Sequence, residues 1–392
     1  MSPILSTHPT PTVQCSEFGT RHMKLGLNQY IAPGETIVST LPVRVEINGM
    51  SFVGGRPSSE SSSGASGGGS MYLEAGTKLK TQQVSFRDNG APGGDGGTIV
   101  SFAGSEIHLY ETSIQRSEAS GVGGALHVVD GTVIMEKTSI TECTAAQGGG
   151  GVSIEANSDP IVVHATDTSI SKCTTAGKGG ALAVSGDFNV LVYDIIMEEN
   201  EASHGGAVHV ADASSFGCAR CTVRANQVLE DGGGLYIGVK STAHFRGTLV
   251  VGNSAEQRGG GLYLERSRGI GVGPAFIDPE TEDVLVYPSS ALTILSNAAR
   301  LQGGGMYLRQ SSNSDAFPGV CERDGVGVQV VSACYSSLFE FVCFVCLCCA
   351  FFFALSSFSF PSFPFPSFAF IVVLDLYSLS LVNMLSFFSF FF

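Results

Sequence analysis

The residues best spaced for chemistry are Cys218 and Cys221, which form a Cys-x-x-Cys motif. That spacing is found in redox pairs and in one half of a zinc site. The sequence has no second Cys/His pair nearby at metal-ligand spacing, and Cys221 falls at a repeat position held elsewhere by Thr138 and Thr168. We interpret the pair as structural and expect neither a metal nor a cofactor, with a redox or metal role as the alternative.

Histidine and aspartate residues also recur, but their separations do not suit one active site. His127 and His209 lie three repeats apart, about 14 Å at one inter-strand spacing per repeat. Asp130, Asp187 and Asp212 each follow a strand at a turn, where Asp is a common residue. We therefore interpret the aspartates as structural.

A carbohydrate-active enzyme would need converging carboxylates, or a base with Arg or Ca²⁺, on one face of the chain. One repeated position, two residues after each Gly-Gly-small triplet, is expected to point outward. It is occupied by Tyr72, Val100, His127, Ser153, Ala183, His209, Tyr236, Tyr263 and Tyr307. Because none of these is Asp, Glu, Arg or Lys, we predict no catalytic site. A polysaccharide lyase, hydrolase or epimerase remains the alternative.

The same position gives a candidate binding site. Tyr236, Tyr263 and Tyr307 recur in consecutive repeats, with His209 beside them. A flat aromatic ladder can stack against sugar rings or a protein partner. The alternative is a stabilising aromatic stack, or a strip covered by a C-terminal cap.

The elements that position these residues are set by an internal repeat. A Gly-Gly pair begins at Gly68 and returns at intervals of 26 to 30 residues, with one interval of 44 before Gly303. Glycine permits tight corners and close backbone contact, so we expect the pairs to be repeat corners. The clearest are Gly123-Gly124, Gly179-Gly180, Gly205-Gly206, Gly232-Gly233 and Gly259-Gly260.

A second marker precedes each later glycine pair by 8 to 10 residues and consists of an apolar residue followed three positions later by a small polar one. Its polar position predicts a structural asparagine ladder, because stacked Asn side chains hydrogen-bond along the stack. The ladder residues are Asn200, Asn226, Asn253 and Asn297. Cys143 and Cys173 occupy the same position in adjacent repeats, as stacked buried thiols or, in a secreted protein, as a disulfide.

The repeat of about 27 residues predicts an all-β solenoid. Its apolar runs are short, rich in β-branched residues and alternate with a period of two, which is typical of strands separated by turns. This length fits three short strands and three turns, the content of one coil of a single-stranded parallel β-helix. We predict about nine to ten coils, roughly 45 Å in total at one strand spacing per coil.

Composition divides the chain into four segments. Residues 1–30 are unassigned and show no signal peptide, so export by that route is not expected unless the true N-terminus is missing. Residues 31–67 are predicted to form an N-terminal cap or early coil with a Ser/Gly-rich loop, and residues 68–310 the regular solenoid. Residues 311–392 form a Phe/Ser-rich apolar tail, interpreted as translated pyrimidine-rich non-coding sequence or, alternatively, as a membrane anchor.

The 44-residue interval contains an insertion around residues 269–290. Insertions in repeat proteins form loops on one face, which is often the binding face. Its acidic run from Asp278 to Asp283 could hold Ca²⁺, but the spacing matches no calcium-binding loop. We interpret it as a solvated loop.

The paired markers resemble the polymorphic outer membrane protein repeat, which combines Gly-Gly-Ala-[Ile/Leu/Val] with Phe-x-x-Asn. Gly123-Gly124-Ala125-Leu126 matches the first motif and Phe86-Arg87-Asp88-Asn89 the second. The resemblance covers residues 68–310 and implies a right-handed, pectin-lyase-like parallel β-helix at the cell surface, in the outer membrane or outside the cell, often with adhesive roles. Chlamydial members end in a transporter β-barrel, which the residues after 310 are too few to supply.

The net charge of the chain limits the classes of partner that we expect it to bind. The formal net charge is −14 and no basic stripe is visible, which argues against nucleic acid. We predict a non-catalytic, adhesin-like scaffold that binds a glycan or a cell-surface protein. Membrane association would occur through the C-terminal tail, and the sequence does not indicate an oligomeric state.

Overall fold

A computed structural model describes residues 12–14, 21–25, 43–57, 67–156, 162–186, 189–211, 214–267, 269–272, 275–277, 284–286, 292–309 and 328–331. The chain divides into two units, residues 1–337 and 338–392, and every described residue belongs to the first. Asp187, Asp212, the acidic run 278–283 and residues 332–392 lie outside the described residues.

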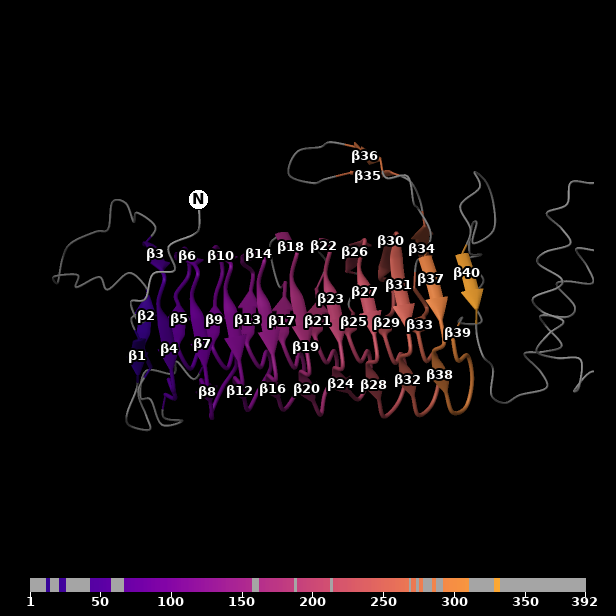
Figure 1. The fold of residues 1–392 in the computed structure, drawn as a ribbon, viewed down its shortest axis with the longest axis horizontal. Coiled ribbons are helices and arrows are strands. Elements are labelled where there is room, and N and C mark those ends of the chain that lie inside the picture. Colours follow the sequence, from indigo (N-terminus) through magenta and orange to yellow (C-terminus); the bar gives the residue numbers. More distant parts are fainter. Residues whose placement is uncertain are drawn as a thin grey trace, which may run out of the picture. The chain divides into compact units, whose positions relative to one another are not determined.

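The described chain is an all-β solenoid of parallel strands (Figure 1). Each coil begins at a glycine pair and contributes one strand to each of four sheets, which we number in chain order. One coil shows the pattern, with β13 (Leu126–Val129), β14 (Thr132–Glu136), β15 (Ser139–Thr141) and β16 (Thr144–Ala145). The prediction of three strands per coil missed the last, two-residue strand, which is too short to give a periodic pattern.

The first sheet follows the glycine pairs. Its strands are β2 (Met23–Leu25), β5 (Met71–Leu73), β9 (Ile99–Ser101), β13, β17 (Val152–Glu155), β21 (Leu182–Ser185), β25 (Val208–Val210), β29 (Leu235–Ile237), β33 (Leu262–Glu265) and β39 (Met306–Arg309). The second sheet comprises β3 (Arg44–Asn48), β6 (Lys78–Gln82), β10 (Glu106–Tyr110), β14, β18 (Val162–Thr166), β22 (Asn189–Tyr193), β26 (Ser215–Ala219), β30 (Thr242–Arg246) and β34 (Gly269–Val272).

The third sheet is the longest. It comprises β1 (Thr12–Gln14), β4 (Ser51–Val53), β7 (Ser85–Arg87), β11 (Ser113–Gln115), β15, β19 (Ser169–Ser171), β23 (Ile196–Glu198), β27 (Thr222–Arg224), β31 (Thr248–Val251), β37 (Leu292–Leu295) and β40 (Val328–Val331). The fourth sheet contains the two-residue strands β8 (Gly90–Ala91), β12 (Glu118–Ala119), β16, β20 (Thr174–Thr175), β24 (Glu201–Ala202), β28 (Gln227–Val228), β32 (Ser254–Ala255) and β38 (Ala298–Ala299). Its eight strands mark eight complete coils among the described residues, slightly fewer than the nine to ten predicted.

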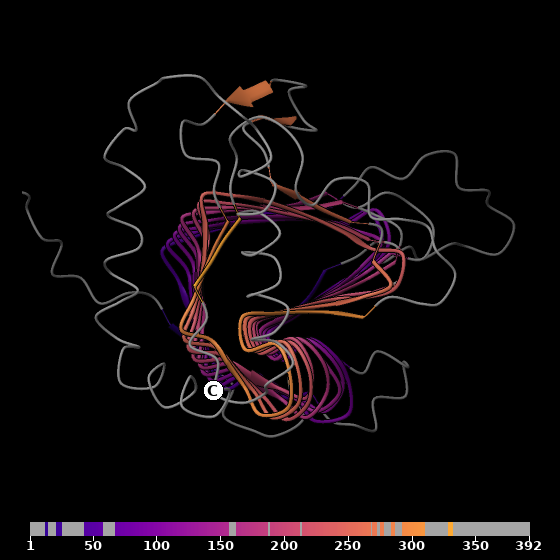
Figure 2. The same ribbon diagram turned by 90° about the vertical axis from the view of Figure 1, so that its right-hand side faces the viewer.

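Buried and partly exposed residues alternate along many of the strands, and the buried ones form the core. In β10, Ile107 and Leu109 are fully buried and point inward, whereas His108 between them is partly exposed. Strands in the same sheet repeat this pattern in register, so that Ile107 pairs with Val133 of the next coil. Figure 2 looks along the solenoid and shows coils superimposed as a large lobe with a tighter curl beside it. The main apolar cluster fills one continuous interior from Ile47 to Ile294.

Two corners of most coils have a non-glycine residue with left-handed backbone, whereas the coil that begins at Gly232 has Gly247 and Gly252 at these corners. Lys137 has φ of 49° between the second and third strands, and Glu142 has φ of 56° after the third strand. This conformation costs a non-glycine residue about 1–2 kcal/mol. Many corner residues form ion pairs with the next coil, as do Asp88 with Arg116 at 2.7 Å and Lys172 with Glu199 at 3.8 Å.

The solenoid extends beyond the regular motif at both ends. At the N-terminal end β1 pairs with β4 and β2 pairs with β5, within a segment that the sequence left unassigned. At the other end β40 pairs with β37, although it lies after residue 310, where the glycine motif stops.

The 44-residue interval between two glycine pairs contains a segment inserted into one coil. Between β34, which still pairs with β30, and β37 the chain forms an antiparallel hairpin of β35 (Ala275–Ile277) and β36 (Val284–Val286).

The described residues include no helix long and apolar enough to cross a membrane.

Candidate functional site

The glycine pairs form corners where adjacent coils touch. The first glycine of all nine pairs has φ between 59° and 74°. The second glycine has no room for a side chain: a Cβ at Gly124 would lie 2.1 Å from the carbonyl oxygen of Gly150. Backbone hydrogen bonds such as Gly124 N to Gly149 O, at 3.0 Å, join these corners along the solenoid. They are structural and leave no space for a ligand.

The asparagines form a continuous buried ladder. The Asn226 side-chain amide donates to Asn253 Oδ1 at 2.9 Å and to the Met197 carbonyl at 3.0 Å. Its Oδ1 accepts from the backbone N–H and the side-chain amide of Asn200, at 3.0 and 2.9 Å. Asn253 binds Asn297 in the same way. The ladder therefore satisfies backbone groups at the end of the third sheet.

The aromatic residues of the first sheet also stack in register. The rings of His209 and Tyr236 have centroids 4.8 Å apart and are inclined by 16°. Tyr236 and Tyr263 follow at 4.9 Å and 15°, and Tyr263 and Tyr307 at 5.3 Å and 17°. The four rings form one ladder parallel to the solenoid axis.

This aromatic ladder does not face solvent, contrary to the expectation of an outward surface. The exposed fraction is 4% for His209, 8% for Tyr236 and 1% for Tyr263, and only Tyr307 is half-buried. The cause is the segment between the fourth-sheet strand of one coil and the first-sheet strand of the next, for example between β28 and β29, which we call the curl. It folds back over the outer side of the first sheet. A Cβ on Gly232 or Gly259 would lie 3.1 or 2.9 Å from the Cβ of the tyrosine in the same coil.

The residue directly before each glycine pair completes this cover. Asp231 and Arg258 form a parallel bridge, and both guanidinium contacts to the carboxylate are about 3 Å long (3.1 and 3.0 Å). The Arg258 guanidinium lies 5.5 Å from the Tyr263 ring centroid and 5.4 Å from that of Tyr307. His204 meets Tyr236 edge-on at 5.4 Å. A cation–π and ion-pair layer thus encloses the ladder.

The phenol groups are held by a small polar cluster. The Tyr236 hydroxyl donates to the Glu265 carboxylate, which also pairs with Arg309 at 3.3 Å. Arg309 also interacts electrostatically with the Tyr263 phenol. Burial, followed by the bond to Glu265, raises the pKa of the Tyr236 phenol far above its ordinary value. Burial lowers the pKa of His209 to about 3. Both groups are therefore neutral at physiological pH.

The sequence did not identify His204, Asp231, Arg258 or Glu265 as partners of the ladder. Three of them share a signal, because each immediately precedes a glycine pair. Glu265 ends the strand that carries Tyr263. Only the fold of the curl brings these positions over the rings.

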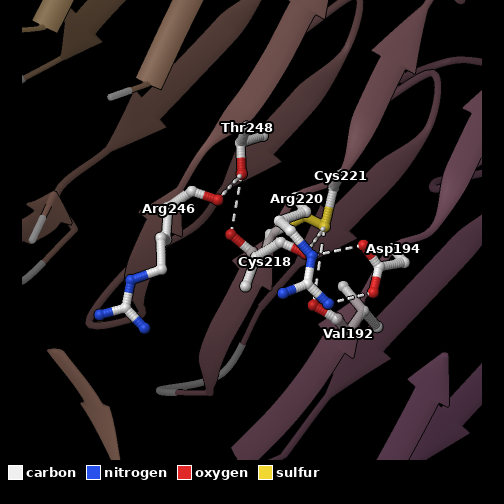
Figure 3. Close-up of a disulfide and its surroundings, with 8 residues drawn as sticks. Val192, Asp194, Cys218, Arg220, Cys221, Arg246 and Thr248 are labelled. Carbon is white, nitrogen blue, oxygen red and sulfur yellow. Dashed lines mark hydrogen bonds and ion pairs between the residues drawn. A yellow bond between two sulfur atoms is a disulfide. The ribbon is translucent and has the colours of Figure 1, made fainter. Parts of the chain in front are cut away.

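The remaining predicted residues lie apart from this cluster. Cys218 and Cys221 form a disulfide with a Cα–Cα distance of 5.9 Å, joining the end of β26 to the next corner (Figure 3). Figure 3 also shows Arg220, between the two cysteines, paired with Asp194 of the preceding coil. Cys143 and Cys173 are buried free thiols, and Asp130 occupies a corner with φ of 48°.

Metal and acid–base chemistry would depend on the other His, Cys, Asp and Glu residues in the described part of the chain. There, no group of three or more His, Cys, Asp or Glu side chains could hold a metal ion. His127 is buried, and its strand neighbour in the next coil is Ser153. Burial lowers the pKa of His127, and the charges of Asp95 and Glu155 oppose that shift.

Comparison with known families agrees with the topology. Residues 99–277 match the family described as a right handed beta helix region. The solenoid is a right-handed β-helix. No curated protein and no solved structure matches the chain. The finer resemblance to polymorphic outer membrane proteins stays a prediction from the motifs.

Proposed function

We propose that this β-helix is a non-catalytic, adhesin-like scaffold, located at the cell surface, in the outer membrane or outside the cell, that binds a glycan or a protein. The location rests on the motif resemblance alone, and membrane association would use the C-terminal tail. The observation that favours a scaffold is the pairing of charges between coils, which engages carboxylates that an enzyme would need free.

The pairing of carboxylates with cations is clearest around the aromatic ladder. Glu265 accepts from Tyr236 and pairs with Arg309, and Asp231 pairs with Arg258. A carboxylate engaged in this way has fewer oxygen lone pairs left to accept a proton from a substrate. The rings themselves are covered, so the ladder supports the scaffold, and a partner would bind the solvent-facing sides of the sheets.

The third sheet offers such a surface. Its outward residues in neighbouring coils are small hydroxyls, including Ser139, Thr141, Ser169 and Ser171. Ser169 Oγ donates to Ser139 Oγ at 3.3 Å, and Thr144 and Thr174 approach to 3.2 Å beside them. Rows of hydroxyls can both donate to and accept from the hydroxyls of a neutral glycan.

A glycan array followed by a turnover assay tests the proposal on the full-length protein. We expect saturable binding to one class of glycan, or to a cell-surface protein, without release of reducing ends or unsaturated products. Substitution of Ser139 and Ser169 by Lys should reduce the affinity at least tenfold. A matched double substitution to Lys on another face, at Thr132 and Ser215, should leave it unchanged. Turnover without saturable binding would overturn the proposal.

A carbohydrate-active enzyme remains the second candidate because one phenol, one carboxylate and one guanidinium meet at Tyr236, Glu265 and Arg309. If this cluster were catalytic, Glu265→Gln would abolish turnover while a Glu198→Gln substitution, which removes the carboxylate paired with Arg224 on the third sheet, would not. If the cluster is structural, both variants would differ only in stability.

A further inference from the structure

The asparagine ladder is interrupted in the middle of the solenoid. Its position is held by Ser117, Cys143 and Cys173 in three consecutive coils. The backbone N–H of Cys173 still donates to Asn200 Oδ1 at 2.9 Å, so the ladder ends there. Between the coils of Cys143 and Cys173, the amide hydrogen bonds of the ladder are replaced by one long contact, from Cys173 Sγ to the Ile140 carbonyl at 4.0 Å.

The register places the two thiols directly above one another. On one side Thr141 pairs with Ser171, and on the other Thr144 pairs with Thr174. Positions 143 and 173 are thus separated by one inter-strand spacing, about 4.8 Å. Disulfides join residues whose Cα atoms lie about 4.4–6.8 Å apart, so a bond requires no backbone movement.

The side chains share one orientation. Each sulfur lies 3.4 Å from the carbonyl oxygen two residues earlier, Thr141 for Cys143 and Ser171 for Cys173. The Cys143 thiol lies close enough to that of Cys173 to influence its pKa. Both residues are fully buried and free. Rotation of the two side chains brings the sulfurs together.

We propose that Cys143 and Cys173 are an oxidation site at which a small peroxide converts the two thiols into a disulfide between adjacent coils. One thiol is oxidised by hydrogen peroxide to a sulfenic acid and releases water. The second sulfur then attacks that sulfenic sulfur, the S–S bond forms, and the hydroxyl leaves with the second thiol proton as water. Two thiols and one peroxide therefore yield one disulfide and two waters.

The burial of the pair sets its reactivity. Burial, followed by the interaction with the neighbouring Cys143 thiol, raises the pKa of the Cys173 thiol. Since the thiolate is the reactive form, oxidation is slow in the folded protein and favours an oxidant small enough to enter the core. The product ties two coils at the break in the ladder, whereas the Cys218–Cys221 disulfide stays within one coil. This inference does not depend on the identity of the ligand.

Peptide mapping tests the oxidation site. The folded full-length protein is incubated with hydrogen peroxide, denatured, alkylated and digested with trypsin without reduction. Trypsin cuts after Lys137, Lys172 and Lys178, so the two cysteines fall in separate peptides, Thr138–Lys172 and Cys173–Lys178. We expect these peptides to become cross-linked in a peroxide-dependent manner, and the thermal unfolding midpoint to rise by several degrees.

Two controls make the result decisive. Trypsin also cuts after Arg220, so the Cys218–Cys221 disulfide joins two peptides. Detection of this cross-link with and without peroxide is the positive control for the mapping. Cys143→Ser should lose both the cross-link and the rise in midpoint while its untreated form unfolds cooperatively. If that variant does not fold, Cys173→Asn, which extends the existing ladder, replaces it. Peroxide-treated wild-type protein whose Cys143 and Cys173 are alkylated, over-oxidised or linked to other cysteines would refute the inference.

Discussion

Tyr263 illustrates how a residue predicted to bind a ligand becomes part of the packing. It lies between two rings of the aromatic ladder, is 1% exposed, and has Arg258 above its ring. Its neighbours in the sequence are core residues, Leu262 and Leu264. All three residues of this strand segment are buried, although strict alternation would leave the middle one in solvent.

Replacing Tyr263 with Ala should therefore destabilise the protein. Loss of a fully buried aromatic side chain costs about 3–5 kcal/mol, and loss of ring stacking adds about 1 kcal/mol. Chemical denaturation would measure the difference. Tyr307→Ala is the matched control: because Tyr307 is half-buried and ends the described ladder, its loss should cost clearly less. Equal costs would mean that burial in the curl does not stabilise the fold.

His209 gives the protein a dependence on pH. Its pKa is lowered by burial to about 3 in the folded state, whereas an unfolded histidine titrates near 6.5. The unfolded chain therefore takes up the proton first as the pH falls, and the stability present above about pH 6.5 is lost progressively toward pH 3. Burial also lowers the pKa of His22, His127, His204 and His244, which act in the same direction.

At pH 5 the contribution of His209 alone is a loss of about 2 kcal/mol relative to pH 7. Urea unfolding across this range would measure it. His209→Phe keeps a ring on Tyr236 but cannot be protonated, so its stability should fall less steeply with acid. An identical pH profile in both proteins would show that His209 does not carry the effect.

At the scale of the element, the asparagine ladder joins neighbouring coils at the end of the third sheet. Asn226→Ala removes one link and leaves the buried Asn200 N–H and Met197 carbonyl without their side-chain partner. A buried group left unsatisfied costs about 1–3 kcal/mol, so we expect a total loss of about 3 kcal/mol by denaturation. The exposed Asn189 at the start of β22 is the control, and its replacement by Ala should change stability by less than about 0.5 kcal/mol.

The Asn226→Asp variant tests whether side-chain size or hydrogen bonding determines stability at this position. The carboxylate keeps the size of the amide but presents an oxygen to Asn253 Oδ1, where the amide now donates at 2.9 Å. We expect this variant to be at least as unstable as Asn226→Ala at neutral pH. A neutral effect would show that packing, and not the ladder of hydrogen bonds, determines stability there.

For the whole molecule, the register predicts that coils are modular. Residues 123–148 contain one full coil, from one glycine pair to the residue before the next. Their deletion brings β9 to β12 against β17 to β20, with like positions still paired. Because repeat proteins are stabilised mainly by nearest-neighbour contacts, we expect a cooperatively folded protein that is one coil shorter.

Circular dichroism and small-angle scattering would show retained β structure and a shorter particle. Deletion of half a coil, residues 123–135, is the matched control. It removes the same kind of sequence but destroys the register, and it should abolish folding. Loss of β structure after deletion of the full coil would contradict the modular interpretation.

The spacing of the repeats was enough to predict the solenoid and the direction of its axis. A glycine pair and an asparagine position that recur together allow only a stack of equivalent coils, and Asn226 and Asn253 could be assigned to one ladder from spacing alone. The two-residue fourth strand escaped prediction because two residues cannot show a period. It is nevertheless this strand, with the curl after it, that turns the chain back over the first sheet.

Which side of the first sheet meets water depends on how the whole coil folds. Alternation along a strand separates two faces but does not say what covers the second one. Tyr236 and Tyr263 looked outward in the sequence, and the curl, with Asp231 and Arg258, buries them. A local pattern records how a side chain points from its own strand, whereas exposure depends on segments that pack there from elsewhere in the coil.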